Sequence, residues 1–234
     1  MPDVPTQFPE PLQDQAPAGQ VADSTTELSA TTTRKRPKPG ERRIQILQAL
    51  ASMLEQPGGE RITTAALAAR LDVSEAALYR HFASKAQMFE GLIDFIEQTV
   101  FSLVNQIVER EQAPSGNAGD LGQRQAAKVI ALLVQFAEKN PGMARVMVGD
   151  ALVFENERLQ QRMNQFFDKI EATLKQCLRD GAAGSTSATP SVDAQVRAAV
   201  LAAFVSGRLQ RFVRSGYKRL PSEHLDASLR VLLG

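Results

Sequence analysis

Two short helical segments separated by three residues are the feature that most constrains this fold. Residues 62–81 read ITTAALAARLDVSEAALYRH, and the chain has helix-forming alanines and leucines on both sides of Leu71-Asp72-Val73. We expect helices at 64–70 and 74–80. Two short helices joined by a turn of this length form a helix-turn-helix unit.

The residue types at the turn and at the helix starts fit this unit. Asp72 is one of the few residues besides glycine that readily adopts a left-handed backbone. Thr63 and Ser74 precede the two helices, where a hydroxyl oxygen accepts hydrogen bonds from the first free N–H groups. We expect three apolar side chains to point inward and two alanines to allow a close crossing: Leu67, Val73, Leu78, Ala68 and Ala77.

The second helix begins with small residues, so it can enter the major groove of DNA without a clash. Ala76 and Ala77 suit contact with thymine methyl groups, and the polar residues at the far end suit contact with phosphates. An alternative remains open, in which Tyr79 and His81 only pack the turn against the next helix. We predict DNA contacts by Arg42, Arg43, Thr63, Thr64, Ser74, Glu75, Ala76, Ala77, Tyr79, Arg80, His81 and Lys85.

The charge is unevenly distributed, although the net charge is only +1. Residues 1–33 contain five acids and no base, whereas residues 34–85 contain ten bases and five acids. A concentrated basic segment is typical of a protein that binds a polyanion. The basic run RKRPKPGERR (34–43) resembles the arms that reach phosphates or the minor groove. A merely solvated basic face would show the same charge pattern.

Most of the chain after residue 40 has helical periodicity, and no segment alternates as a strand does, so we predict an all-α fold. We expect a disordered tail with its basic arm (1–40), a helix-turn-helix DNA-binding domain (41–85), and a further helical domain (86–234), to which the family resemblance assigns dimerisation and partner binding. Loops are expected at 113–120 and 181–191, and Pro57-Gly58-Gly59 should end the first helix. Further helices are expected near Lys85–Glu111, Arg124–Lys139, Met143–Val148, Asn156–Arg179, Asp193–Ser215 and Ser222–Leu233.

Catalytic and metal chemistry is not indicated. Ser74 and His81 lie at opposite ends of one short helix, which is not the geometry of a nucleophile and its base. Two histidines and Cys177 are too few for a zinc site, and no phosphate-binding glycine loop is present. We therefore expect no enzyme activity, cofactor or metal. A single cysteine and the lack of a leader or a membrane-spanning run favour a cytoplasmic protein.

A family likeness is carried by residues 62–89, which resemble the DNA-binding domain of TetR-type regulators, including the pattern LY-x-HF-x-x-K (Leu78, Tyr79, His81, Phe82 and Lys85). Over roughly 41–234 the chain resembles nucleoid occlusion factors of the SlmA type. The stretches that carry this likeness are 61–97, FAEKNPG (136–142), 151–179 and RFVRSGYK (211–218).

This resemblance implies a TetR-like three-helix head, a helical body and a homodimer on a palindromic DNA site, with several dimers per site as one arrangement. The resemblance also implies that the dimer is associated with the nucleoid, and that the DNA-bound dimer binds the division protein FtsZ and inhibits assembly of the division ring over the chromosome. The last two helices of this chain would pair with the same helices of a second subunit. Four residues would be buried between them: Val196, Val200, Phe204 and Leu229. The FtsZ-binding residues carried over by the resemblance are Phe95, Leu132, Lys139 and Asn140, while Leu103 and Gln135 depart from the family pattern.

Two other functions fit the sequence. A ligand-responsive TetR-type transcriptional repressor would need an enclosed apolar cavity in the body. A helical interaction protein that does not use DNA would retain the head only as a scaffold, which the basic arm at 34–43 argues against.

Overall fold

The all-α expectation is confirmed. The computed structural model describes residues 40–56, 61–110, 118–181 and 188–234, and within these ranges the chain forms helices and no strand. The elements are α1 (Glu41–Leu54), α2 (Thr64–Arg70), α3 (Glu75–Tyr79), α4 (Lys85–Arg110), α5 (Ala118–Lys139), α6 (Pro141–Met147), the 3₁₀ helix η1 (Asp150–Leu152), α7 (Glu157–Gly181), α8 (Pro190–Arg214) and α9 (Leu225–Leu233).

Several helix boundaries differ from the sequence expectation, and three of the differences have clear consequences or causes. The helix expected from Arg124 begins at Ala118, so part of the expected loop 113–120 is helical. Helix α8 begins at Pro190, because a proline at the first helical position has no N–H to satisfy and its φ already suits a helix. Helix α9 begins only at Leu225, because His224 has a left-handed φ of 54° that interrupts the expected helix from Ser222. The expected tail up to residue 39 and Pro57-Gly58-Gly59 lie outside the described residues.

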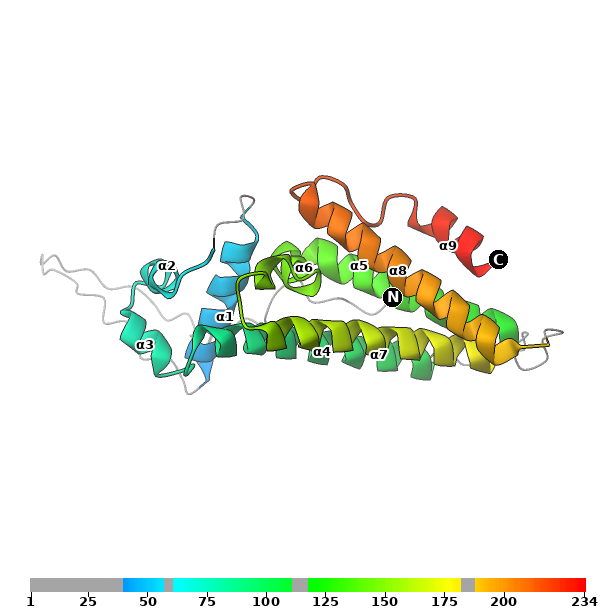
Figure 1. The fold of residues 1–234 in the computed structure, drawn as a ribbon, viewed down its shortest axis with the longest axis horizontal. Helices are drawn as coiled ribbons and strands as arrows, with labels where there is room; N and C mark the ends of the chain where they lie inside the picture. Colours follow the sequence, from blue (N-terminus) through cyan, green and yellow to red (C-terminus); the bar gives the residue numbers. More distant parts are fainter. Residues whose placement is uncertain (1–39, 57–60, 111–117, 182–187) are drawn as a thin grey trace, which may run out of the picture.

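The helices form a head and an elongated body (Figure 1). Helices α1, α2 and α3 lie together at one end, and α4 leaves this head and runs along the body beside α7. Helix α5 packs against α4, α7 and α8, and α9 packs against α5 and α8. The short α6 lies where the head meets the body and contacts α1, α4, α5 and α8. The candidate DNA-binding residues of α2 and α3 thus lie at one end of the molecule, and α4 runs from that end along the body.

Helix α4 is fixed to the body by an apolar stripe and by ion pairs on one flank. Its buried residues recur every three or four positions, which places them on the side that faces α5 and α7. On the α7 flank, Arg158 pairs with Glu90, and Arg162 pairs with Glu97 and, at 3.0 Å, with Asp94. The acids in the first half of α4 therefore point toward α7.

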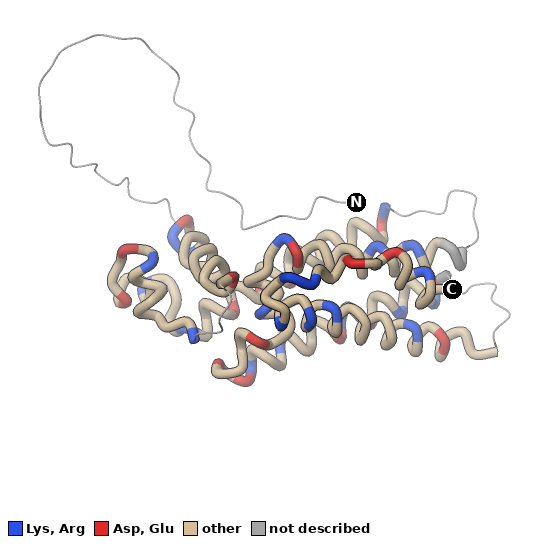
Figure 2. Tube along the Cα trace, turned by 90° about the horizontal axis from the view of Figure 1, so that it is seen from above, with Lys and Arg blue, Asp and Glu red and all other residues tan. Residues whose placement is uncertain are grey.

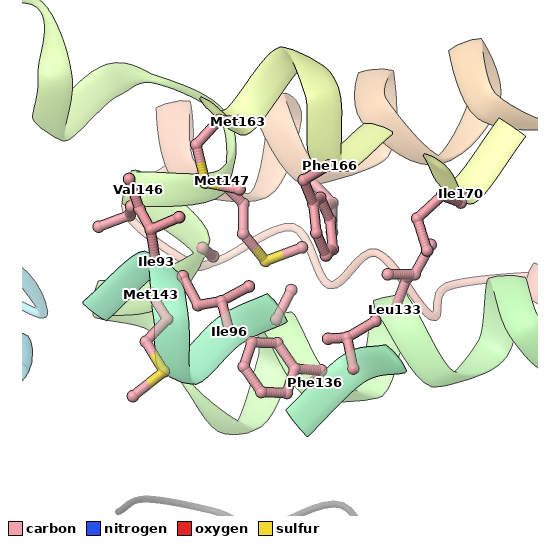
Figure 3. Close-up of a cluster of buried hydrophobic side chains, with 14 of the residues drawn as sticks. Ile93, Ile96, Leu133, Phe136, Met143, Val146, Met147, Met163, Phe166 and Ile170 are labelled. Atoms are coloured by element: carbon pink, nitrogen blue, oxygen red, sulfur yellow. The ribbon is translucent and has the colours of Figure 1, made fainter. Parts of the chain in front are cut away.

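One apolar core runs through the head and the body. Figure 3 shows its central part, where Ile93 and Ile96 of α4 meet Phe136 of α5 and Met143 of α6. Phe166 of α7 closes the cluster and packs edge-on against Phe101 at a centroid distance of 5.4 Å. Each such buried side chain contributes about 1.5–3 kcal/mol relative to an exposed one, so this core holds the helix arrangement.

The head is joined to the body through the last turn of α1. The Leu54 carbonyl oxygen accepts hydrogen bonds from Arg145 Nη1 (3.2 Å) and from Tyr217 Oη (3.0 Å). Gly142 packs directly on this turn, since a Cβ added there would lie 2.2 Å from the Ala51 carbonyl oxygen. Burial raises the pKa of Tyr217 above its usual value, so its hydroxyl keeps the proton that it donates. Helices α6 and α8 thus fix the orientation of α1.

Candidate nucleic-acid interface

The α2–turn–α3 unit has the local structure that the sequence predicts. Thr63 Oγ1 accepts a hydrogen bond from the Ala66 N–H at 3.1 Å, and Ser74 Oγ accepts one from the Ala77 N–H at 3.3 Å. Both predicted caps are therefore confirmed. Asp72 has φ 53°, which confirms the expected left-handed turn residue. Leu67, Ala68 and Leu78 are buried, and Val73 is half-buried against the core.

The outer face of α3 carries four of the predicted DNA contacts. Glu75, Ala76, Tyr79 and Arg80 are exposed, with 46% of Tyr79 accessible, while Ala77 is half-buried. Almost half of Tyr79 is open to solvent, so its hydroxyl can reach an outside partner, and the DNA contact stays a prediction. The structure thus brings an alanine, an aromatic hydroxyl and a cation to one short helical surface, which suits groove and phosphate contacts.

The starts of α2 and α3 are tied to one another. Thr64 Oγ1 donates a hydrogen bond to Glu75 Oε2, so a hydroxyl of α2 holds the first acid of α3. Thr63 and Ser74 use their hydroxyl oxygens as caps, which leaves those hydroxyl hydrogens available to an outside acceptor. The two helix starts form one polar edge next to the exposed alanine of α3.

Arg43 links the start of α1 to the end of α3. Its guanidinium donates a hydrogen bond to the His81 carbonyl oxygen and lies 4.1 Å from the centroid of the Phe82 ring. Arg42 instead donates to Gln45 within α1. The His81 side chain is half-buried at this junction. Arg43 and His81 therefore have structural contacts, whatever else they bind.

Lys85 lies in a different environment from the one expected from the sequence. It forms an ion pair with Glu155, which follows η1, and only 18% of the Lys85 side chain is exposed. Its amine also lies 5.6 Å from the centroid of Phe89. Lys85 thus connects α4 to the α6–α7 connection and is directed toward the body. The phosphate contact predicted for Lys85 stays a prediction, and it would have to form beside this ion pair.

The described head is less basic than the whole segment 34–85. Lys and Arg alternate with Asp and Glu over the head in Figure 2. Four of the ten bases of that segment, Arg34, Lys35, Arg36 and Lys38, belong to the basic arm outside the described residues. The positive charge available to a polyanion therefore depends on the arm as well as on α2 and α3.

Two family models match the chain. A model described as bacterial regulatory proteins, tetR family, matches residues 46–92, and an SlmA-like model described as tetracyclin repressor-like, C-terminal domain, matches residues 124–233. The nucleoid occlusion factor SlmA of Idiomarina loihiensis is 49% identical over 191 residues, which cover 82% of this chain and 93% of the relative. SlmA of Vibrio cholerae is 50% identical over 186 residues, which cover 79% and 90%. The chain belongs to the SlmA family.

Solved structures of other regulators share the fold of this SlmA-family member. FadR from Bacillus subtilis, in complex with stearoyl-CoA, has a TM-score of 0.62 at 15% identity and covers 81% of this chain and 97% of its own. PfmR from Thermus thermophilus has a TM-score of 0.63 at 18% identity, covering 82% and 95%. At these identities the likeness establishes the TetR-type fold alone.

SlmA-family and TetR-family proteins are DNA-binding regulators, and this chain is therefore a DNA-binding regulator and not an enzyme.

In the described part of the chain, no three His, Cys, Asp or Glu side chains gather as a metal site would need. Burial raises the pKa of Cys177 to about 11, so the thiol stays protonated and unreactive at neutral pH. No helix among the described residues is long and apolar enough to cross a membrane.

The predicted FtsZ-binding residues of this SlmA-family member come from α4, from α5 and from the residue that joins α5 to α6. Phe95 of α4 is half-buried and Lys139 at the end of α5 is exposed. Leu132 and Asn140 are buried, and the Asn140 side chain donates a hydrogen bond to the Phe136 carbonyl oxygen at 2.9 Å. Only Phe95 and Lys139 of the four therefore present side-chain surface in this structure.

The residues that hold the head on the body were not evident from the sequence. Arg145, Tyr217 and Gly142 contact the last turn of α1. Tyr217 lies in the RFVRSGYK stretch that the family likeness included, but nothing in that stretch indicates a partner in α1. The pairing follows from the fold, because Tyr217 and Leu54 are 163 positions apart.

Proposed function

We propose that this SlmA-family member binds palindromic sites on the chromosome as a homodimer and, in that state, binds FtsZ and inhibits division-ring assembly over the nucleoid. The observation that carries the proposal is about 50% identity with curated nucleoid occlusion factors over almost their full length. The exposed surface of α3 supplies the required DNA contact.

In this proposal the α3 face enters the major groove. Ala76 and Ala77 lie against base edges, while Tyr79 and Arg80 contact phosphates and set the register. Thr63 and Ser74 direct their hydroxyl hydrogens and the nearby helix N–H groups at the DNA backbone, while Thr64 keeps its hydroxyl hydrogen on Glu75. The arm that ends at Arg42 and Arg43 adds sequence-independent affinity.

A hydrophobic stripe on α8 supports the homodimer. Val192, Val196 and Val200 are four positions apart, so they lie on one face of the helix, and each is exposed. Val231 of the adjacent α9 is 83% exposed. We propose that these four valines form the centre of the dimer interface. Leu229, expected in that interface, is buried within the subunit, and Phe204 is half-buried beneath Arg208.

A dimer with two-fold symmetry places two α3 helices on one face of the duplex, so the half-sites must be about one helical turn or its multiple apart. DNA then gathers dimers on the nucleoid, and each dimer presents its α4–α5 surface around Phe95 and Lys139 to FtsZ. Several dimers on one site would present several such surfaces to one FtsZ polymer.

Co-sedimentation with FtsZ polymers tests the proposal. We expect the protein to pellet with FtsZ, more strongly when a duplex carrying its palindromic site is present than with a scrambled duplex. The matched control is Tyr79→Ala/Arg80→Ala, which should lose the response to DNA while retaining the fold. If the protein stays in the supernatant both with and without the specific duplex, an FtsZ-directed function is rejected. DNA binding would then be the only function that remains.

One structural observation favours a second candidate, a ligand-responsive transcriptional repressor. A partly open groove of about 740 Å³ lies between the α6–η1 segment, α7 and α8, and its lining includes Met147, Met163, Phe167 and Val213. This volume lies in the range of small-molecule sites. A small apolar molecule with polar groups that releases the protein from its duplex at micromolar concentration would support this function, and a Phe167→Trp variant, which enlarges a half-buried side chain of the groove, should block that release.

A further inference from the structure

Glu75 is an acid on the surface that would face DNA. It is exposed on α3 between Ser74 and Ala76, on the same short helical surface as Tyr79 and Arg80. Phosphates repel a carboxylate, so an acid at this place lowers the affinity for every duplex alike unless a hydrogen-bond donor of the DNA faces it. A favourable role for Glu75 must therefore come from α3 itself or from a donor on the bases.

The side chain of Glu75 is held by α2. Thr64 Oγ1 donates its hydrogen to Glu75 Oε2, across eleven positions of the chain. Among the described residues, no lysine or arginine pairs with Glu75, so its charge is not neutralised there. A carboxylate can accept about four hydrogen bonds, so the bond from Thr64 leaves acceptor capacity while it restricts the direction of the side chain.

The chemistry of the major groove narrows the partner of such a carboxylate to one base. An ionised carboxylate only accepts hydrogen bonds, and the donors that bases present in this groove are the amino groups of cytosine and adenine. Adenine places its N7 acceptor beside its amino group, and that acceptor repels a carboxylate oxygen, whereas cytosine presents only the donor. A carboxylate fixed on a helix in the major groove therefore favours cytosine over the other bases.

We propose that Glu75 is a specificity-determining residue that reads one cytosine in each half-site, and that Thr64 is the residue that positions its carboxylate. The cytosine N4–H donates to the acceptor positions of Glu75 that Thr64 leaves free. The contact is made by a side chain and uses no N–H group of the helix. The next residue, Ala76, is small and exposed, so it leaves room for the base edge to approach the carboxylate.

This reading of cytosine rests on the proposed function for the placement of α3 in the major groove, and it does not involve FtsZ. A purely structural role for Glu75 is the competing explanation, because an acid in the first turn of a helix interacts favourably with the helix dipole. That role would give Glu75 no preference for any base. Base preference therefore separates the two explanations, since helix stability alone does not alter it.

The test selects duplexes from a pool with a random stretch of about two helical turns, using the full-length protein without FtsZ. The unmodified protein should enrich a palindrome in which each half-site has a fixed C·G pair opposite Glu75. Glu75→Ala should enrich the same palindrome with that pair relaxed to all four bases and the other positions kept. Glu75→Gln should change the pair to A·T, because a glutamine amide accepts from adenine N6 and donates to adenine N7.

Anisotropy titrations then measure the size of the effect, with the selected duplex and a duplex changed at that pair in both half-sites. The change should weaken binding of the unmodified protein roughly tenfold or more per half-site, but binding of Glu75→Ala by less than about twofold. In Thr64→Val the discrimination should fall about threefold, with cytosine still preferred, because the carboxylate must then be ordered on binding.

The charge-matched control is Asp72→Asn. Asparagine also tolerates the left-handed backbone of this exposed turn residue, so the fold of the unit is kept. The lost negative charge should raise the affinity for every duplex alike and leave the base preference unchanged. The control thus distinguishes a general effect of charge from the reading of a base.

Retention of the fixed C·G pair by Glu75→Ala would overturn the proposal and leave Glu75 a structural role in α3. A base other than cytosine at the pair that Glu75→Ala relaxes would also overturn it, and undiminished discrimination by Thr64→Val would overturn the positioning role of Thr64. If the unmodified protein enriches no palindrome, the sequence-specific DNA binding of the proposed function fails as well. A protein that selects its duplex as expected but does not co-sediment with FtsZ would contradict the proposed function alone.

Discussion

The phenol of Tyr217 donates a hydrogen bond to the Leu54 carbonyl oxygen at 3.0 Å, and so the segment after α8 caps the last turn of α1. The Tyr217 ring also packs against Phe212 of α8 at a centroid distance of 5.2 Å. Tyr217 therefore connects α8, which carries the proposed dimer interface, to α1 of the DNA-binding head. A shift of the end of α8 would therefore also move the last turn of α1.

Tyr217→Phe tests this contact. Removing the hydroxyl while keeping the ring should lower the free energy of unfolding by about 1 kcal/mol, because one hydrogen bond to a part-buried carbonyl is lost. Urea denaturation would measure the loss. Tyr79→Phe, which removes a hydroxyl from an exposed ring, should leave the midpoint unchanged. An equal effect of the two variants would contradict the role of Tyr217.

Gly142→Ala tests the close packing of α6 on α1. The added Cβ would lie 2.2 Å from the Ala51 carbonyl oxygen, so the two helices must separate, at a cost of roughly 2–3 kcal/mol in unfolding free energy. Gly207→Ala is the matched control, since a Cβ there meets nothing within 4 Å of the subunit and alanine favours a helix. Thermal unfolding at one protein concentration compares the two variants, with oligomeric state checked in parallel because Gly207 lies on α8.

Arg80 and Lys85 should respond differently in DNA binding. Arg80→Ala removes an exposed cation beside α3, so the slope of log affinity against log salt should fall by about 1. Lys85→Met should leave that slope unchanged, because Lys85 is held by Glu155. Fluorescence anisotropy at several salt concentrations would separate them. A smaller slope for Lys85→Met would restore Lys85 as a phosphate contact.

Val196→Glu should separate the proposed dimer. Val196 is 56% exposed in the subunit, and two glutamates facing one another in a closed interface would be desolvated without partners. We expect dimer affinity to fall on the order of 100-fold or more, measured by sedimentation equilibrium. Val108→Glu is the control, because it changes an exposed valine of α4, a helix outside the proposed interface. Dissociation in both variants, or in neither, would argue against the α8 stripe.

Local chemistry determines much of the head. The caps at Thr63 and Ser74 and the left-handed Asp72 depend on neighbours within three residues, so the sequence alone predicts them. The helix starts expected at Arg124 and Asp193 are wrong. Helices α5 and α8 begin earlier, at Ala118 and Pro190, in stretches whose glycine, serine and proline content is typical of loops.

The tertiary structure alone decided which cations and polar groups have partners. Lys85 and Glu155 are 70 positions apart, and Tyr217 and Leu54 are 163 apart, so no periodicity or motif could pair them. Helix periodicity says which face of a helix is apolar, but not which other helix covers it or which charge lies opposite. The sequence therefore determined that this chain is helical with a DNA-binding head, and packing determined how that head is held.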